Sequence, residues 1–159
     1  MQFNKVLVLV TGEPSDANAV SHAATLVREN RGRLIILYVI LVERSLPLDA
    51  EMSDQVARAE LILNRAEAAA NLQRNVIEAE MLQSREVGAA VVHEAAVRDI
   101  DAVVISTAYP RSKGKFSLGT DIPYVLEFAA CNVILVREAI VGARPEGRQI
   151  MSRSGASSA

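Results

Sequence analysis

The sequence predicts an α/β fold, an open five-stranded parallel sheet with helices on both faces. Short, nearly continuous aliphatic runs alternate along the chain with longer segments whose apolar residues recur every three or four positions. Turn-forming residues separate most of these segments. Strands that alternate with helices are joined by right-handed crossovers, which favour a doubly wound parallel sheet.

The first half of the chain supplies two strands and two helices. Residues 5–10 (KVLVLV) and 33–40 are aliphatic runs, typical of strands buried on both faces. Between them, Ser15 is predicted to cap a helix and Gly32 to end it. After a loop that contains Pro47, Asp49 is predicted to cap a long second helix.

The second half supplies three strands and two helices. Residues 75–82 alternate apolar and acidic side chains, as an edge strand does, and residues 86–98 form a helix. Residues 101–107 are a further buried strand, and residues 132–137 are a fifth strand. Between these strands, Thr120 caps a short helix. We expect this helix to bury Ile122, Val125, Leu126 and Ala129.

Residues 1–140 are predicted to form one domain, and residues 141–159 a flexible tail. The tail is rich in Gly, Ser and Arg and has no apolar periodicity. A length of 159 residues fits a single domain. The lone cysteine, Cys131, excludes an intrachain disulfide and fits a reducing compartment.

Composition and charge exclude several classes of partner. The net charge is −2, and aromatic residues make up 4% of the chain without any Trp, so we expect no nucleic-acid binding. The longest apolar run, residues 34–42, is far shorter than the roughly 20 residues of a membrane helix. Residues 1–10 are predicted to be a first strand and not a signal peptide. We therefore expect a cytoplasmic protein without direct membrane insertion.

The familiar catalytic and cofactor motifs are absent. The sequence has no GxGxxG after the first strand, no Walker P-loop and no GxSxG nucleophile elbow. One cysteine and two distant histidines, His22 and His93, cannot form a CxxC motif or a zinc cluster. We therefore expect no strong catalysis and no intrinsic metal site. A divalent metal would come only with a bound phosphate.

Doubly wound sheets bind ligands beyond the carboxyl ends of their strands, so residues 11–15 and 106–120 are the candidate segments. The second segment carries three cations and ends in a glycine and a threonine at a helix N-terminus, an arrangement that can hold phosphate. These residues are Arg111, Lys113, Lys115, Gly119 and Thr120. The alternative interpretation is an ordinary capped helix after a surface loop.

Over residues 3–140 the chain resembles the universal stress protein (UspA) family. The matching stretches include KVLVLVTGEPSDANAVSHAATLV, RLIILYVI, DAVVIS and GTDIPYVLEFAACNVILVRE. The segments RSLPLDAE and PYVL also resemble stress-protein domains attached to amino-acid transporters. The resemblance implies strand order 3-2-1-4-5, the adenine nucleotide alpha hydrolase-like arrangement.

The family's nucleotide motif is partly present. Nucleotide-binding members carry G-x2-G-x9-G-[ST]. Here Gly119 and Thr120 match its end, while Ser106 and Tyr109 replace its first two glycines. Thr11 stands where the family usually has an acidic residue, and the adenine-contacting backbone maps to Val39 and Ile40.

The resemblance therefore implies a regulatory module of the stress response that binds ATP, ADP or AMP. Thr11 and Gly12 would border the base or ribose, and Ser106, Gly119 and Thr120 would hold phosphates. Slow hydrolysis of a bound nucleotide is compatible with this hypothesis. The alternative is a scaffold that binds no nucleotide, forms a homodimer through residues 133–136 and regulates a partner such as a membrane transporter. An enzyme on this fold is the third hypothesis.

Overall fold

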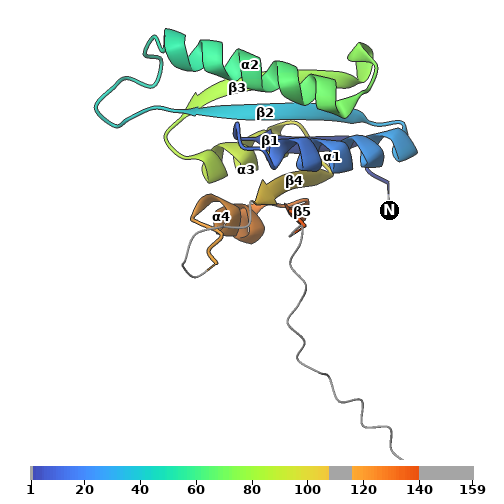
Figure 1. The fold of residues 1–159 in the computed structure, drawn as a ribbon. Helices are drawn as coiled ribbons and strands as arrows, with labels where there is room; N and C mark the ends of the chain where they lie inside the picture. Colours follow the sequence, from blue (N-terminus) through green and yellow to red (C-terminus); the bar gives the residue numbers. More distant parts are fainter. Residues whose placement is uncertain (1, 108–115, 140–159) are drawn as a thin grey trace, which may run out of the picture.

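A computed structural model describes residues 2–107 and 116–139 and contains one sheet of five parallel strands. The strand order is β3-β2-β1-β4-β5, which confirms the predicted fold class and order (Figure 1). The strands are β1 (Lys5–Val10), β2 (Arg33–Leu41), β3 (Ile77–Ser84), β4 (Ala102–Thr107) and β5 (Asn132–Arg137). The predicted tail, residues 141–159, lies outside the described residues.

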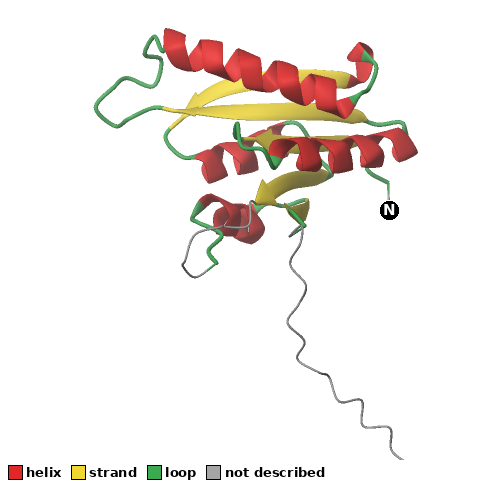
Figure 2. Ribbon diagram, viewed as in Figure 1, coloured by secondary structure: helices red, strands yellow, loops and turns green. Residues whose placement is uncertain are grey.

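Helices follow the strands in alternation (Figure 2). They are α1 (Asp16–Asn30), α2 (Ser53–Ala70), α3 (Val87–Val97) and α4 (Asp121–Phe128), with a short 3-10 helix η1 (Arg74–Val76) before β3. None of the helices in the described part of the chain is long and apolar enough to cross a membrane.

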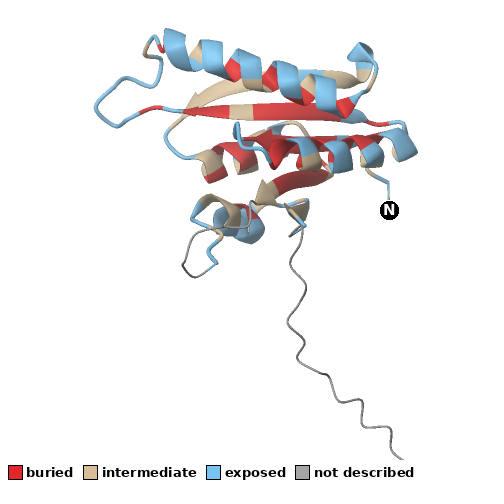
Figure 3. Cartoon of the chain, viewed as in Figure 1, coloured by how far each residue is buried: buried red, intermediate tan, exposed pale blue. Residues whose placement is uncertain are grey.

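The sheet separates two apolar layers. Val6, Val8 and Val10 of β1 pack under α1 and α2, while Leu7 and Leu9 of the same strand pack under α3 and α4. Alternate residues of a strand point to opposite faces, so a continuous aliphatic run fills both layers. Figure 3 shows the central strands largely buried and the edge strands β3 and β5 only partly buried.

The end of α1 differs from the prediction. The left-handed residue that ends the helix is Arg31, with φ 53°, and not Gly32. Gly32 is needed for space, because a Cβ there would lie 2.6 Å from the carbonyl oxygen of Asn4. This close approach lets the N–H of Arg33 donate to that oxygen at 2.8 Å and align β2 with β1.

Two further predictions were wrong at helix positions. Asp49 does not cap α2, which begins at Ser53, because residues 47–50 first form a turn in which Ala50 N–H donates to the Pro47 carbonyl at 3.0 Å. Leu126 of α4 is 47% exposed, and only Val125 of that helix is buried. A helix of eight residues makes only about two turns, so few of its positions can face the sheet.

Candidate functional site

Two adjoining hollows lie where β1 and β2 end. The first measures about 220 Å³ and brings Thr11 together with Val39. The second measures about 410 Å³ and lies between the N-termini of α3 and α4, where Thr120 lines it. Leu41 and Val87 line both hollows, so the two are neighbours. The strand ends therefore bring residues from both halves of the chain to one edge of the sheet.

The loop after β1 is held by a buried carboxylate. The Asp16 side chain accepts the backbone N–H groups of Thr11 at 3.0 Å and Gly12 at 2.7 Å. Burial raises the pKa of Asp16, although these hydrogen bonds oppose the shift. The two amides at the end of β1 are therefore already bonded to an anion of the chain itself.

Gly12 and Ile40, two of the predicted site residues, face other surroundings. Gly12 has φ 87° and lines a separate hollow of about 250 Å³ beside α2, where a Cβ would meet Ile62 at 2.9 Å. The Ile40 side chain is buried under α2 with Val42 and Met52, so it does not line the hollow beside Thr11.

Ser106 lies near the end of β4, beside the start of α1. Its hydroxyl donates to the Ser15 hydroxyl at 3.1 Å. Ser15 occupies the predicted cap position of α1, but its side chain makes no capping bond to that helix. The pair thus links β4 to the α1 N-terminus.

The N-termini of α3 and α4 meet at Asp121. Thr120 takes the predicted cap position of α4, without a capping bond from its side chain. Asp121, the next residue, accepts the Gly88 N–H of α3 at 3.0 Å. Gly119 has φ 69°, and a Cβ there would meet nothing within 4 Å, so this glycine is required for backbone conformation and not for space.

Arg85 fixes the segment that follows β2. Its guanidinium donates to the backbone carbonyls of Val42, Glu43 and Leu46, with a distance of 2.7 Å to Leu46. Leu41, the last residue of β2, and Arg85 itself line the second hollow. The guanidinium therefore acts first as a structural donor to the loop.

Three predicted cations, Arg111, Lys113 and Lys115, lie outside the described residues. Within the described ranges, no group of three or more His, Cys, Asp or Glu side chains could hold a metal ion. Cys131 is half-buried at the opposite end of the sheet, and burial raises the pKa of its thiol.

A parallel sheet with hollows beyond its strand ends defines a doubly wound α/β domain, a class that binds small ligands at this edge. The chain belongs to the universal stress protein family, whose model matches residues 2–137. This confirms the family resemblance noted in the sequence. None of the curated proteins matches the sequence closely enough to count as a relative.

Solved structures of universal stress proteins share the fold. One, in complex with cAMP, is 18% identical with a TM-score of 0.64 over 86% of this chain and 98% of that chain. One from Archaeoglobus fulgidus, in complex with dAMP, is 16% identical with a TM-score of 0.67 over 85% of this chain and 98% of that chain. UspA from Lactobacillus plantarum is 20% identical with a TM-score of 0.66 over 86% of this chain and 99% of that chain.

Sequence reasoning missed the roles of Asp16, Arg85 and Asp121. Asp16 and Asp121 each lie in the first turn of a helix, a position from which the sequence alone predicts interaction with the helix dipole. The bond from Gly88 to Asp121 spans 33 positions, however, and the bonds of Arg85 span about 40. Contacts between such distant residues are visible only in the folded chain.

Proposed function

We propose that this protein is a regulatory module of the stress response that binds an adenine nucleotide across the two adjoining hollows. The observation that carries this proposal is the meeting of Thr11, Val39 and Thr120 around neighbouring hollows at the strand ends. The family membership supports it, as do the related structures that hold cAMP and dAMP.

In this proposal the base lies beside Thr11 and contacts the backbone of Val39 and Ile40. The phosphates lie toward the residues at the end of β4 and the start of α4, helped by the cations of the connecting segment. These residues are Ser106, Arg111, Lys113, Lys115, Gly119 and Thr120. ATP, ADP and AMP are the candidate ligands, and a divalent metal would enter only with their phosphates.

We assign the protein a binding role and not a catalytic one, acting in the cytoplasm. A catalyst needs a nucleophile or general base placed against its substrate. At the second hollow, the charged side chains of Arg85 and Asp121 are engaged with backbone groups, and Glu86 is the remaining carboxylate among the described residues that line it. Slow hydrolysis of a bound nucleotide is compatible with this role. We assign residues 1–140 to the stress-protein domain and residues 141–159 to a tail.

Mass spectrometry and calorimetry test the nucleotide proposal. Freshly purified protein is denatured, any released nucleotide is identified, and the emptied protein is titrated with ATP, ADP and AMP. We expect micromolar binding of at least one of them. Thr11→Phe fills the first hollow and should weaken binding at least about tenfold, a loss of roughly 1.4 kcal/mol.

Thr25→Phe is the matched control, because Thr25 is exposed on α1 and lies outside both hollows. It should leave affinity unchanged. Equal affinity in Thr11→Phe and wild type would place the site elsewhere. If no nucleotide is released and no heat of binding is seen, the nucleotide proposal is wrong.

The edge strand β5 favours a second function, a dimeric scaffold that regulates a partner such as a membrane transporter. Its central residues, Val133, Ile134, Leu135 and Val136, are aliphatic and only partly buried. Such an edge can pair with a second copy. Sedimentation equilibrium should give twice the monomer mass, and a monomeric mass at micromolar concentration would contradict this function.

A further inference from the structure

Asp121 places a negative charge between two helix N-termini. It is the first residue of α4, and its carboxylate accepts a first-turn N–H of α3 from Gly88 at 3.0 Å. Helix N-termini carry partial positive charge and unbonded N–H groups, which is why they bind anions. In this chain the protein's own carboxylate already occupies that place.

The approach of the two helices fixes this arrangement. A Cβ at Gly88 would lie 3.1 Å from the Asp121 carbonyl oxygen and 3.1 Å from Cβ of Tyr124. The glycine therefore lets α4 pack directly against α3, and Asp121 is held at the hollow lined by Thr120. An anion that enters this hollow meets a fixed carboxylate.

Among the described side chains that line the second hollow, the positive charge of Arg85 is matched by the negative charge of Glu86, so the Asp121 carboxylate remains as an excess negative charge. Glu86 also lines the second hollow, and the guanidinium of Arg85 is bonded to the carbonyls of Val42, Glu43 and Leu46. On the β1 side, the Thr11 and Gly12 amides are taken by Asp16. The Thr11 amide at the first hollow and the Gly88 amide at the second are thus bonded to carboxylates of the chain itself.

We propose that Asp121 determines which nucleotides the site accepts, so that an adenine nucleotide with one phosphate group binds in preference to a triphosphate. This inference rests on the nucleotide site proposed above. A hollow of about 220 Å³ beside Thr11 leaves the phosphates to enter the neighbouring hollow at Asp121. Each added phosphate brings more negative charge toward the fixed carboxylate, and like charges repel more strongly near a protein surface than in bulk water.

Calorimetric titration of the full chain with AMP and ATP tests this inference. We expect wild type to bind AMP at least about tenfold more tightly than ATP. Asp121→Asn keeps an oxygen that can accept the Gly88 N–H and removes the charge. It should therefore tighten ATP binding about tenfold and change AMP binding less.

Glu127→Gln is the matched control, because it removes one exposed carboxylate from the same helix, about 9 Å along the axis from Asp121. It should leave the preference unchanged, and thermal unfolding should show both variants folded. Wild-type binding of ATP as tightly as AMP, or an Asp121→Asn variant with unchanged ATP affinity, would overturn the inference and leave the nucleotide site intact. If neither nucleotide binds to wild type or Asp121→Asn, the proposed function fails and this inference fails with it.

Discussion

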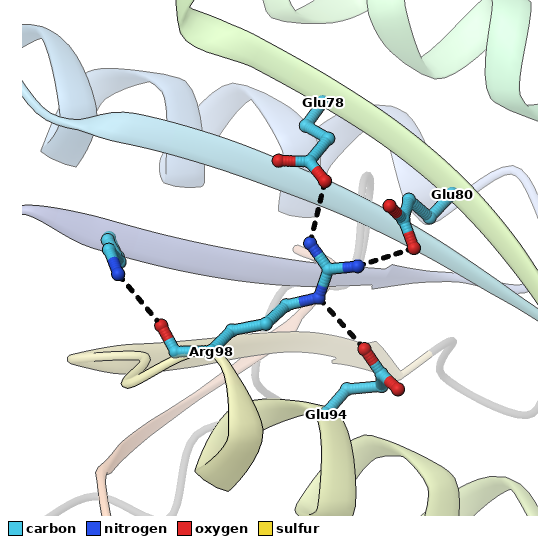
Figure 4. A network of polar contacts seen from close by, with 5 residues as sticks. Glu78, Glu80, Glu94 and Arg98 are labelled. Atoms are coloured by element: carbon cyan, nitrogen blue, oxygen red, sulfur yellow. Dashed lines mark hydrogen bonds and ion pairs between the residues drawn. The ribbon is translucent and has the colours of Figure 1, made fainter.

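The two edges of the sheet are built from opposite chemistry. At β3, Glu78 and Glu80 extend toward Arg98, which follows α3, and Arg98 also bonds Glu94 of that helix (Figure 4). At β5, the four central residues are aliphatic and partly exposed. One edge thus carries a bonded charge cluster and the other an apolar strand.

This difference indicates which edge of the sheet can pair with another chain. Charged side chains on an edge strand oppose pairing with another chain, whereas an apolar edge invites it. The N–H of Asn132 donates to Asp101, and the N–H of Glu138 donates to Thr107. Because a parallel strand bonds one neighbour at every second residue, the backbone groups of Val133 and Leu135 point away from β4. The comparison therefore supports β5 as the surface for a second copy.

The largest expected effect comes from breaking the β5 edge. Leu135→Pro removes an N–H that points outward while leaving the bonds between β5 and β4 in place, and edge strands tolerate such a proline. We expect the dimer to weaken by at least about 100-fold, because one proline removes a pairing bond and disturbs the strand at the interface. Sedimentation equilibrium across a concentration series measures this change.

Ala79→Pro on β3 is the matched control. The Val42 N–H donates to Ser84, which places the outward-facing backbone of β3 at odd-numbered residues such as Ala79. This variant should keep the wild-type mass. If Ala79→Pro becomes monomeric while Leu135→Pro remains a dimer, the dimer forms through β3 and not through β5.

A smaller effect is expected when the charge cluster on β3 is broken. Arg98→Met leaves the carboxylates of Glu78, Glu80 and Glu94 without their shared partner. The Arg98 side chain is only 23% exposed, so we expect the free energy of unfolding to fall by about 1–2 kcal/mol. Urea unfolding at neutral pH measures the loss.

The control for this loss is Arg58→Met, which removes an exposed guanidinium from α2. It should change the free energy of unfolding by less than about 0.5 kcal/mol. Equal losses in the two variants would show that the cluster on β3 adds no stability beyond that of an ordinary surface charge.

The smallest expected effect is the pH dependence of this cluster. The Arg98 guanidinium hydrogen-bonds Glu78 and holds the pKa of that carboxyl below its usual range. The stabilisation is therefore complete above the usual pKa of about 4.3 and is lost as the pH falls through the lower folded value. Because the Glu78 side chain is 48% exposed, solvent screening limits this contribution to less than about 1 kcal/mol.

Urea unfolding of wild type and Arg98→Met at pH 7 and pH 3 measures the pH dependence of the pairs that Arg98 makes. The difference in the free energy of unfolding between the two proteins should shrink at pH 3, because the protonated carboxyl no longer pairs with Arg98. A difference that stays constant or grows on acidification would contradict the stabilisation of ionised carboxylates by Arg98.

The elements were predictable where local chemistry decides them. The run KVLVLV became β1 with the predicted bounds, and residues 132–137 became β5 with theirs. The alternation around Glu78 and Glu80 predicted an edge strand, and β3 lies at one edge of the sheet. A strand buried on both faces gives a continuous apolar run, and a strand buried on one face alternates apolar and polar residues. Both kinds of strand can therefore be recognised from the sequence.

The candidate site was predictable only in outline. Because ligands bind beyond the strand ends of such sheets, residues 11–15 and 106–120 were the predicted candidate segments. Thr11 and Thr120 from these segments line adjoining hollows. The same reasoning could not foresee that the Ile40 side chain turns under α2, or that Gly12 lines a different hollow. Those outcomes depend on how the helices pack on the strand ends.

The sequence by itself determined the class of fold, the order of its elements and the family, because apolar period, turn residues and the Gly119-Thr120 motif are local patterns. Only the tertiary structure decided what the charged residues do. Asp16 reaches back to the end of β1, Asp121 reaches across to α3, and Arg98 joins α3 to β3. The physical reason is that a charge takes the partner that folding brings within hydrogen-bonding distance, and sequence separation says little about which partner that is.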